Sequence, residues 1–542
     1  MTAHSPVADP ATAPPRTTTV RTVDADDRGR VREPAIIAVF GALVAFAWSW
    51  TPSLWFDEAA TVVAATRPWP DLARMLTTVD AVHATYYSFM HVWFDLFTYT
   101  PVTLRLPSAL AVGIAAGLTA VLGRMLAGRR VGLLAGLLFC VIPRVTWMGG
   151  EGRSFALATL LCVVASILFL TAWRRTTAGS PSARWWVAYT VVALLSCAVF
   201  LYVALVVVGH GVTALVLTLR RDRSVDPDEE ARPSPDTGAP DTVAEAPHRW
   251  RPALRWAVAA VITAVGCIPL ARLSSDQSKQ ISWITRPTLH AVSEVFTTQW
   301  FPGNTWFATL AWLLMAAGFV FAIVRSTRAK TTLLALALPW IFVPTLGLIA
   351  YSLVRTPLYS PRYVSFAAPG VAILMALGLS WIRPRLVIAA VVVVSIMLSV
   401  PTYLAQRQPT AKDASAWNEV AALVAKQRAL EKPGSKDAVV YGPVRRHPAT
   451  TSRIIQDTYP SAFTGIDDIT LDQKAEDTDG LWSTQYPLED VLDKTAAVDT
   501  VWLITSDKND WRPRVTADLA TEGFHVDEQW HFSRTNVVRY EK

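Results

Sequence analysis

The chain has 542 residues, of which 52% are hydrophobic and 17% are charged, and its mean hydropathy is +0.31. Soluble domains carry about 25% charged residues, so this composition excludes an ordinary soluble enzyme. Repeated apolar runs of membrane-spanning length instead predict a polytopic α-helical membrane protein. The formal net charge of +7 therefore bears on membrane topology first, and we expect no nucleic-acid partner.

Residues 1–33 form a polar segment rich in Pro, Thr, Ala, Asp and Arg. Such a segment cannot bury a core, so we expect a disordered tail that its arginines hold in the cytoplasm. The transmembrane domain is expected over 34–403, with its first span at about 35–51. Residues 52–103 would then form a long external loop. Its aromatic stretch 84–98 is about half a membrane long, which favours an amphipathic interfacial helix over a second span.

Arginine clusters at the ends of the later apolar runs support that choice. If 84–98 does not cross, the clusters beginning at Arg124, Arg174 and Arg220 fall in the cytoplasm; if it crossed, they would fall outside. Further spans are expected at about 104–122, 131–147, 154–172, 185–201, 203–219, 254–270, 306–324, 331–351, 364–381 and 386–403. This gives about eleven spans, with the N-terminus inside and the C-terminus outside.

Two further segments lie between or after the spans. Residues 220–253 are acidic, proline-rich and aperiodic, which predicts a disordered cytoplasmic loop. Residues 404–542 are polar and combine a helical pattern with strand-like runs. The helical pattern covers about 413–430 and the strand-like runs are 438–441, 501–505, 525–532 and 536–540. We therefore expect a C-terminal extracytoplasmic α/β domain, to which the sequence assigns no chemistry because no glycine-rich phosphate loop opens it.

Two adjacent carboxylates, Asp57 and Glu58, follow the first apolar run directly. In the hydrocarbon each would cost about 2.5–3.5 kcal/mol, whereas at the membrane rim they are tolerated and can act as acids or bases. A purely structural alternative is that they favour the N-terminus of the following helix. By the predicted topology they emerge on the outer side.

Other charged side chains are expected on the same external face. They are Asp80, His83, Arg105, Glu151, Arg153, Arg355 and Arg362. Several have structural alternatives: a snorkelling anchor for Arg105, an ion pair for Glu151 and Arg153, a structural role for His83 and an interfacial anchor for Arg362. Together they suit a reaction in which a carboxylate activates a hydroxyl while arginines bind a lipid-linked phosphate. The second carboxylate would orient the acceptor or a metal ion.

The order of these motifs is similar to that in the bacterial membrane glycosyltransferases of the GT-C superfamily, and within it the protein O-mannosyltransferase and aminoarabinose-transferase branch. The matching elements are Trp55-Phe56-Asp57-Glu58, His83 to Tyr87, Arg105-Leu106-Pro107-Ser108-Ala109, Gly128 to Gly132, Pro143, Glu151 to Ala156 and Pro361-Arg362-Tyr363. The resemblance covers about the first 200 residues well. Ala84-Thr85 replace the two prolines of a His-Pro-Pro element, and Phe155 replaces a tyrosine.

The resemblance implies inverting transfer of a sugar from a polyprenyl-phosphate donor on the outer face of the plasma membrane. It implies that Asp57 is catalytic, with Glu58 as its neighbour, and that Arg105 contacts the lipid phosphate. The expected substrate-binding set is His83, Tyr87, Arg105, Glu151, Arg153, Arg362 and Tyr363. No cofactor is certain, and a divalent cation on Asp57 and Glu58 is the one candidate.

Mannose is the expected donor sugar and arabinose the second choice, because the composition and the long C-terminal domain look actinobacterial. The acceptor would be a glycolipid, a polysaccharide or a protein of the cell envelope. A transporter or flippase is disfavoured because the middles of the spans are nearly free of charge and no internal repeat is visible. A ligase or polymerase of lipid-linked glycans and a non-catalytic scaffold stay as alternatives.

Overall fold

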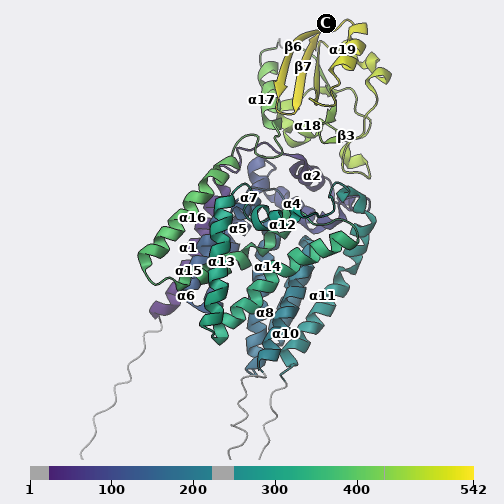
Figure 1. The fold of residues 1–542 in the computed structure, drawn as a ribbon. Helices are drawn as coiled ribbons and strands as arrows, with labels where there is room; N and C mark the ends of the chain where they lie inside the picture. The colour runs from purple at the N-terminus through teal and green to yellow at the C-terminus, as the bar shows by residue number, and fades with distance from the viewer. Residues whose placement is uncertain (1–23, 222–248, 432–433) are drawn as a thin grey trace, which may run out of the picture.

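The computed structural model describes residues 24–221, 249–431 and 434–542. It consists of a helical body and a smaller domain, formed by the C-terminal residues, that sits on one end of the body (Figure 1). The tail predicted over 1–33 and the loop predicted over 220–253 fall mostly outside the described residues. Within the described part, α1 begins at Asp24, ahead of the predicted domain boundary at residue 34.

Long apolar helices build the body. They are α1 (Asp24–Phe46), α5 (Pro101–Ala127), α6 (Arg129–Val141), α7 (Pro143–Gly149), α8 (Phe155–Thr177), α9 (Ala183–Val199), α10 (Ala204–Arg221), α11 (Arg251–Asp276), α13 (Thr305–Val324), α14 (Arg328–Val354), α15 (Ala368–Trp381) and α16 (Arg385–Ala405). Among the described residues, eight helices are long and apolar enough to cross a membrane, and a ninth span results if α6 and α7, bent by 65°, count as one. The total of eleven would add α1 and α9 and stays a prediction.

Short helices cover the end of the body that faces the C-terminal domain (Figure 1). They are α2 (Phe56–Ala65), α3 (Trp69–Leu76), η1 (Ala81–His83), α4 (Ala84–Leu96), η4 (Ser278–Ile281), α12 (His290–Ser293) and η5 (Glu294–Thr298). Helix α4 has 13 residues, a length of about 20 Å at 1.5 Å per residue. A hydrocarbon core is about 30 Å thick, so α4 is too short to span it.

The C-terminal domain is an α/β unit, which confirms the class expected from its sequence. Its helices are α17 (Trp417–Arg428), α18 (Ile454–Thr458) and α19 (Arg512–Thr521). Its strands are β1 (Asp437–Tyr441), β2 (Pro443–Val444), β3 (His447–Thr451), β4 (Asp467–Asp468), β5 (Thr500–Ser506), β6 (His525–Phe532) and β7 (Thr535–Glu541). The main sheet has the order β4-β1-β5-β7-β6. Strand β1 pairs in parallel with β4 and β5, whereas β7 is antiparallel to β5 and β6. Strands β1 and β5 are buried along their whole length, as parallel central strands require.

The C-terminal domain and the 54–104 segment share one hydrophobic core. Leu54, Val62 and Tyr87 from that segment pack in the same cluster as Trp417 and Trp502 of the domain. Apolar burial stabilises by roughly 25 cal/mol per Å², so this shared core fixes the domain to the end of the body.

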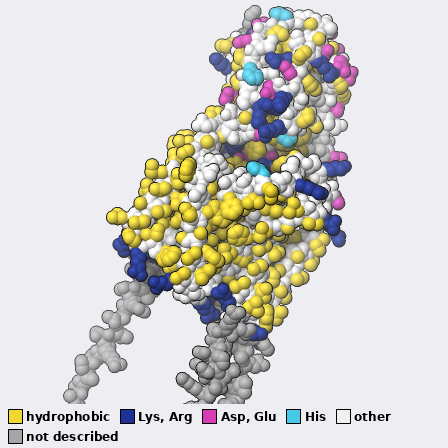
Figure 2. Space-filling view, viewed as in Figure 1, with side chains coloured by type: hydrophobic (Ala, Val, Ile, Leu, Met, Phe, Trp, Pro, Cys, Tyr) yellow, Lys and Arg dark blue, Asp and Glu magenta, His cyan; other side chains and the backbone are white. Residues whose placement is uncertain are grey.

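The surface is divided along the long axis of the molecule. On the face seen in Figure 2, an apolar belt covers the helical body, and Lys and Arg side chains gather at the end opposite the C-terminal domain. Exposed apolar side chains such as Leu313, Leu346 and Leu386 belong to this belt. A contiguous exposed apolar surface of this kind fits a membrane-embedded region.

Candidate active site

Asp57 and Glu58 lie in the first turn of α2. Successive helical residues are rotated by about 100°, so the two carboxylates face different surroundings. The side chain of Glu58 is fully buried, whereas that of Asp57 is 24% exposed. The pair therefore divides into one buried carboxylate and one that solvent or a substrate can reach.

Glu58 and Arg105 form a buried ion pair. Arg105 donates from Nε to Oε1 of Glu58 at 2.8 Å and from Nη2 to Oε2 at 2.6 Å. The Gly152 backbone N–H also donates to Glu58, at 2.8 Å. Burial would raise the pKa of Glu58, but the charges of Arg105 and Lys412 outweigh it and lower the pKa to about 2. Glu58 is thus charged at neutral pH, and both of its oxygens accept hydrogen bonds.

The remaining N–H donors of Arg105 bind backbone carbonyl oxygens. Its Nη1 donates to the carbonyl oxygens of Ser49 at 2.7 Å and Pro52 at 2.8 Å, and none of its side chain is exposed. The expected contact of Arg105 with a lipid phosphate does not fit this geometry, because the guanidinium faces the protein on every side. Arg105 and Glu58 instead fix the chain where it leaves α1 and enters α2.

Glu151 is joined to Glu58 by a lysine that the sequence did not reveal. Lys412 Nζ lies 2.7 Å from Oε1 of Glu58 and 3.1 Å from Oε1 of Glu151. Trp55 donates from its indole nitrogen to Oε2 of Glu151 at 3.0 Å. Burial raises the pKa of Glu151 and Lys412 opposes that rise. Lys412 follows the last apolar run and belongs to no recognisable motif. Neither spacing nor composition could therefore have identified it as a residue of the site.

Arg153 holds a second part of the network together. It donates from Nη1 to the backbone oxygen of Asp57 at 3.1 Å and to the Tyr87 hydroxyl at 3.2 Å. Its Nη2 lies 2.7 Å from Nε2 of His83. The Tyr87 hydroxyl in turn donates to Asp80 at 2.7 Å.

His83 is neutral in this setting. Burial lowers its pKa well below the ordinary value, and the charge of Arg153 lowers it further. Because Arg153 can only donate, Nε2 of His83 accepts the hydrogen bond and the ring proton resides on Nδ1. Nδ1 is buried and has no partner in the described part of the chain.

Asp57 and Arg362 form the partly exposed pair of the site. Arg362 Nη1 lies 3.1 Å from Oδ2 of Asp57, and the two side chains are 21% and 24% exposed. The guanidinium of Arg362 lies over the rings of Trp55, Trp283 and Tyr363, at 5.5, 5.2 and 5.6 Å from their centroids. Its Nε–H is buried without a partner among the described residues.

The nine residues expected to be catalytic or substrate-binding lie in one contiguous network of the described residues, which Arg355 does not join. They are Asp57, Glu58, His83, Tyr87, Arg105, Glu151, Arg153, Arg362 and Tyr363. The structure separates them by exposure. Glu58, Tyr87, Arg105, Glu151 and Arg153 form a buried frame, whereas Asp57, His83, Arg362 and Tyr363 are partly exposed.

The network does not fit a metal site on Asp57 and Glu58. Both oxygens of Glu58 accept hydrogen bonds, and the donors include the cations Arg105 and Lys412, whose charges would repel a divalent ion bound beside them. No group of three His, Cys, Asp or Glu side chains with metal-binding geometry occurs in the residues that the structure describes.

Comparison with models of protein families and with curated proteins gives no match. Comparison with solved structures gives several matches. ArnT from Cupriavidus metallidurans in the apo state matches with a TM-score of 0.52 and 14% identity, over 95% of this chain and 98% of that chain. The chain has a GT-C fold.

Two other solved structures match with lower TM-scores. The archaeal oligosaccharyltransferase AglB from Archaeoglobus fulgidus matches with a TM-score of 0.48 and 11% identity, over 89% of this chain and 70% of that chain. The mycobacterial arabinofuranosyltransferase AftD gives a TM-score of 0.43 and 16% identity, over 94% of this chain and 41% of that chain. The match to ArnT confirms the predicted fold class, a polytopic helical membrane protein with a C-terminal sheet domain.

Proposed function

We propose that this protein is a membrane glycosyltransferase that moves a sugar from a polyprenyl-phosphate donor to a cell-envelope acceptor. Mannose is the proposed sugar and arabinose the alternative; the acceptor is a glycolipid, a polysaccharide or a protein. The fold shared with ArnT supports this proposal, since ArnT has also been crystallised bound to undecaprenyl phosphate.

The Asp57–Arg362 pair is the observation that carries the proposal. It joins an accessible carboxylate to an arginine with an unpartnered, buried Nε–H. An unsatisfied buried donor is unfavourable by about 1–3 kcal/mol, so its presence at an accessible pair indicates a place for an acceptor group. A phosphate oxygen supplies such an acceptor, and arginine binds phosphate through two parallel hydrogen bonds.

These groups suit single-displacement sugar transfer. Oδ1 of Asp57, which does not bind Arg362, would accept the proton of the acceptor hydroxyl. The hydroxyl oxygen would form a bond to the anomeric carbon while the bond from that carbon to the phosphate oxygen breaks. The electron pair leaves with the polyprenyl phosphate, whose charge Arg362 stabilises. Attack opposite the leaving group inverts the anomeric centre.

We place this reaction on the outer face of the plasma membrane, with the N-terminus in the cytoplasm and the C-terminal domain outside. The arginines and lysines at the far end of the body support that orientation, because cytoplasmic loops carry an excess of Lys and Arg. The catalytic pair lies at the opposite end, beside the C-terminal domain.

The decisive experiment supplies the purified, reconstituted protein with polyprenyl-phosphate radiolabelled mannose or arabinose and a crude envelope extract. We expect label to enter an envelope component from one donor. Asp57→Asn should lower the rate by about 10²–10⁴-fold, the usual contribution of a general base, at unchanged protein yield. Transfer by the variant at the wild-type rate would contradict the assignment of Asp57. Movement of intact donor across the vesicle without label transfer would instead indicate a flippase.

A further inference from the structure

Lys412 is the member of the network that comes from the segment between α16 and the C-terminal domain. Its ammonium group contacts Glu58, Glu151 and the Gly150 carbonyl oxygen, the last at 2.6 Å. The contacts with Glu58 and Gly150 are hydrogen bonds, and the contact with Glu151 is an ion pair. The side chain is 8% exposed, so it serves the interior of the site and does not face the solvent.

Two routes lead from Lys412 to the accessible pair. Glu58 neighbours Asp57 in the first turn of α2. Glu151 binds the Trp55 indole, and Arg362 lies over the ring of Trp55. A buried carboxylate that loses its cation takes up a proton or shifts. The position of the Lys412 ammonium group therefore influences both Asp57 and Arg362.

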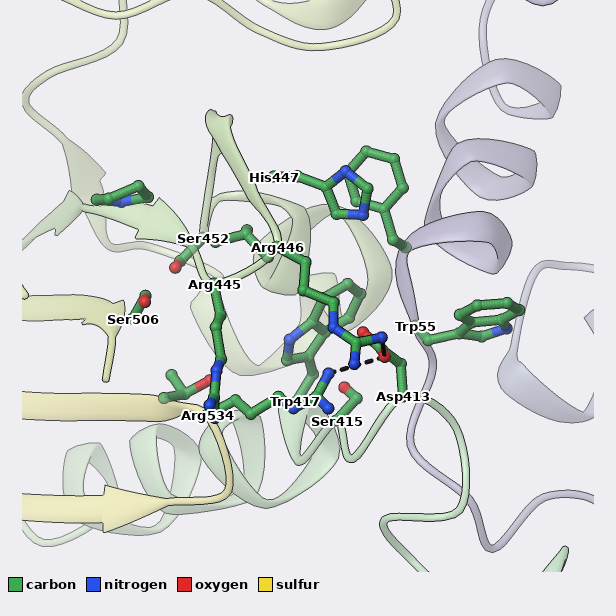
Figure 3. A pocket seen from close by; sticks show the side chains of 14 residues that line it. Trp55, Asp413, Ser415, Trp417, Arg445, Arg446, His447, Ser452, Ser506 and Arg534 are labelled. Atoms are coloured by element: carbon green, nitrogen blue, oxygen red, sulfur yellow. Dashed lines mark hydrogen bonds and ion pairs between the residues drawn. The ribbon is translucent and has the colours of Figure 1, made fainter. Parts of the chain in front are cut away.

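The next residue, Asp413, faces the C-terminal domain. Its Oδ1 accepts a hydrogen bond from Arg446 and forms an ion pair with Arg534, whose Nη1 lies 2.8 Å away. These arginines lie in the turns between β6 and β7 and between β2 and β3. Figure 3 shows Asp413 beside the side chains of Arg446 and Arg534, in a cleft that Trp55 also lines. Figure 2 shows the hollow between the body and the domain, with basic side chains gathered above it.

The backbone at this point is strained. Asp413 and Ala414 both have a φ of +50°, and each residue other than glycine held in the left-handed region is disfavoured by about 1–3 kcal/mol. Two in succession persist only because contacts on both sides hold them. Lys412 is held by the network, Asp413 by the two arginines, and Ser415 by a contact of 3.1 Å between its Oγ and that of Ser53.

We propose that Lys412 and Asp413 couple the C-terminal domain to the active site. A change in the position of the domain would move Asp413 through its contacts with Arg446 and Arg534. Lys412, the preceding residue, would then change the positions of Glu58 and Glu151. This inference rests on the proposed function for its catalytic consequence. Lys412 is a positioning residue in this scheme, because it touches carboxylates of the frame and not the reacting atoms.

Amide hydrogen exchange tests the coupling and requires no measurement of enzymatic activity. In reconstituted full-length protein, Asp413→Asn should speed amide exchange in peptides covering 53–60 and 149–154, which lie in the helical body. Asn tolerates the left-handed backbone, so the variant removes the charge and keeps the turn. Asp507→Asn is the matched control, since Asp507 binds Arg445 of the same β2–β3 turn at 2.9 Å but has no bond to Asp413. Unchanged exchange in Asp413→Asn, or equal changes in both variants, would overturn the proposal.

Kinetics test the catalytic consequence. Asp413→Asn should lower kcat by about 2- to 30-fold, the usual range for a coupling residue, with the donor KM nearly unchanged. Lys412→Met should lower kcat more, and Lys412→Arg should restore part of it. A Lys412→Met variant with the wild-type kcat would refute the positioning role. If wild-type protein transferred none of the donors, the proposed function would fail, while the exchange result would still decide the coupling.

Discussion

Arg105 and Arg362 show how burial assigns different roles to two arginines at one site. Arg105 is enclosed by Glu58 and backbone oxygens, whereas Arg362 is accessible and has an unpartnered Nε–H. Sequence reasoning placed both near the lipid phosphate. It could not separate them, because the Glu58–Arg105 pair joins residues from different helices and no local pattern encodes it.

Substitution should separate the two arginines experimentally. Arg362→Gln should raise the donor KM by about 10- to 100-fold, because charge-assisted hydrogen bonds contribute about 1.5–3 kcal/mol. Arg105→Gln should instead lower the free energy of unfolding by about 3–5 kcal/mol, since it breaks a buried ion pair. Donor titration and thermal melting in detergent measure the two effects. The reverse pattern, with a higher donor KM in a stable Arg105→Gln protein, would restore the phosphate contact to Arg105.

The free energy of unfolding should depend on pH through Glu58. Its pKa is lowered from an ordinary 4.5 to about 2, so the unfolded chain binds its proton more readily than the folded one. Its stabilising effect is therefore complete above about pH 4.5 and is lost as the pH falls toward 2. The melting temperature of wild type should exceed that of Glu58→Gln at pH 7, and the difference should shrink below pH 4.5. A difference that is constant from pH 7 to pH 3 would contradict the assigned ion pair.

Helices α13 and α15 illustrate packing at the level of elements. A methyl group on Gly378 would lie 2.0 Å from the Leu314 carbonyl oxygen, and one on Gly318 would lie 2.5 Å from that of Leu374. The two glycines thus let the helix backbones touch, as small residues do where membrane helices cross. Hydropathy located both helices, but it carries no information about which helices are neighbours, so this crossing could not be predicted.

Gly378→Ala should therefore destabilise the protein by about 1–3 kcal/mol, as overpacking in a close-packed interior does. Gly370→Ala on the same helix is a suitable control. There the nearest atom would be Cγ1 of Ile341 at 3.2 Å, a side-chain atom that can move. Thermal melting of the two variants in the same detergent makes the comparison. Equal melting temperatures would show that the close crossing of α13 and α15 is not present.

At the scale of the whole molecule, the arginine distribution predicted an orientation and the apolar runs predicted the helical body. The shared core between the 54–104 segment and the C-terminal domain had no signal in the sequence, because its members come from segments that are far apart along the chain. The same holds for Lys412 and Asp413. Local periodicity reports which face of an element is apolar, but not which distant element covers it.

Cysteine labelling tests the orientation. Ser461 in the C-terminal domain and Ser326 at the opposite end are both exposed. In a Cys267→Ser background, Ser461→Cys should react with an impermeant maleimide in intact cells, and Ser326→Cys should react only after permeabilisation. The opposite pattern would invert the topology and place the Asp57–Arg362 pair in the cytoplasm.

Helix α16 gives the bilayer itself an influence on the site. Only 11% of its most apolar 18-residue stretch is buried inside the protein, so in a membrane lipid would surround most of its length. At its end, Gln406 and Arg407 bind the Pro143 and Ala47 carbonyl oxygens, both at 2.9 Å, and Lys412 follows five residues after Arg407. A helix adjusts its tilt to the thickness of the hydrocarbon layer. Under the proposed function, acyl-chain length therefore becomes a variable of catalysis, and transfer rates would be comparable only between membranes of equal thickness.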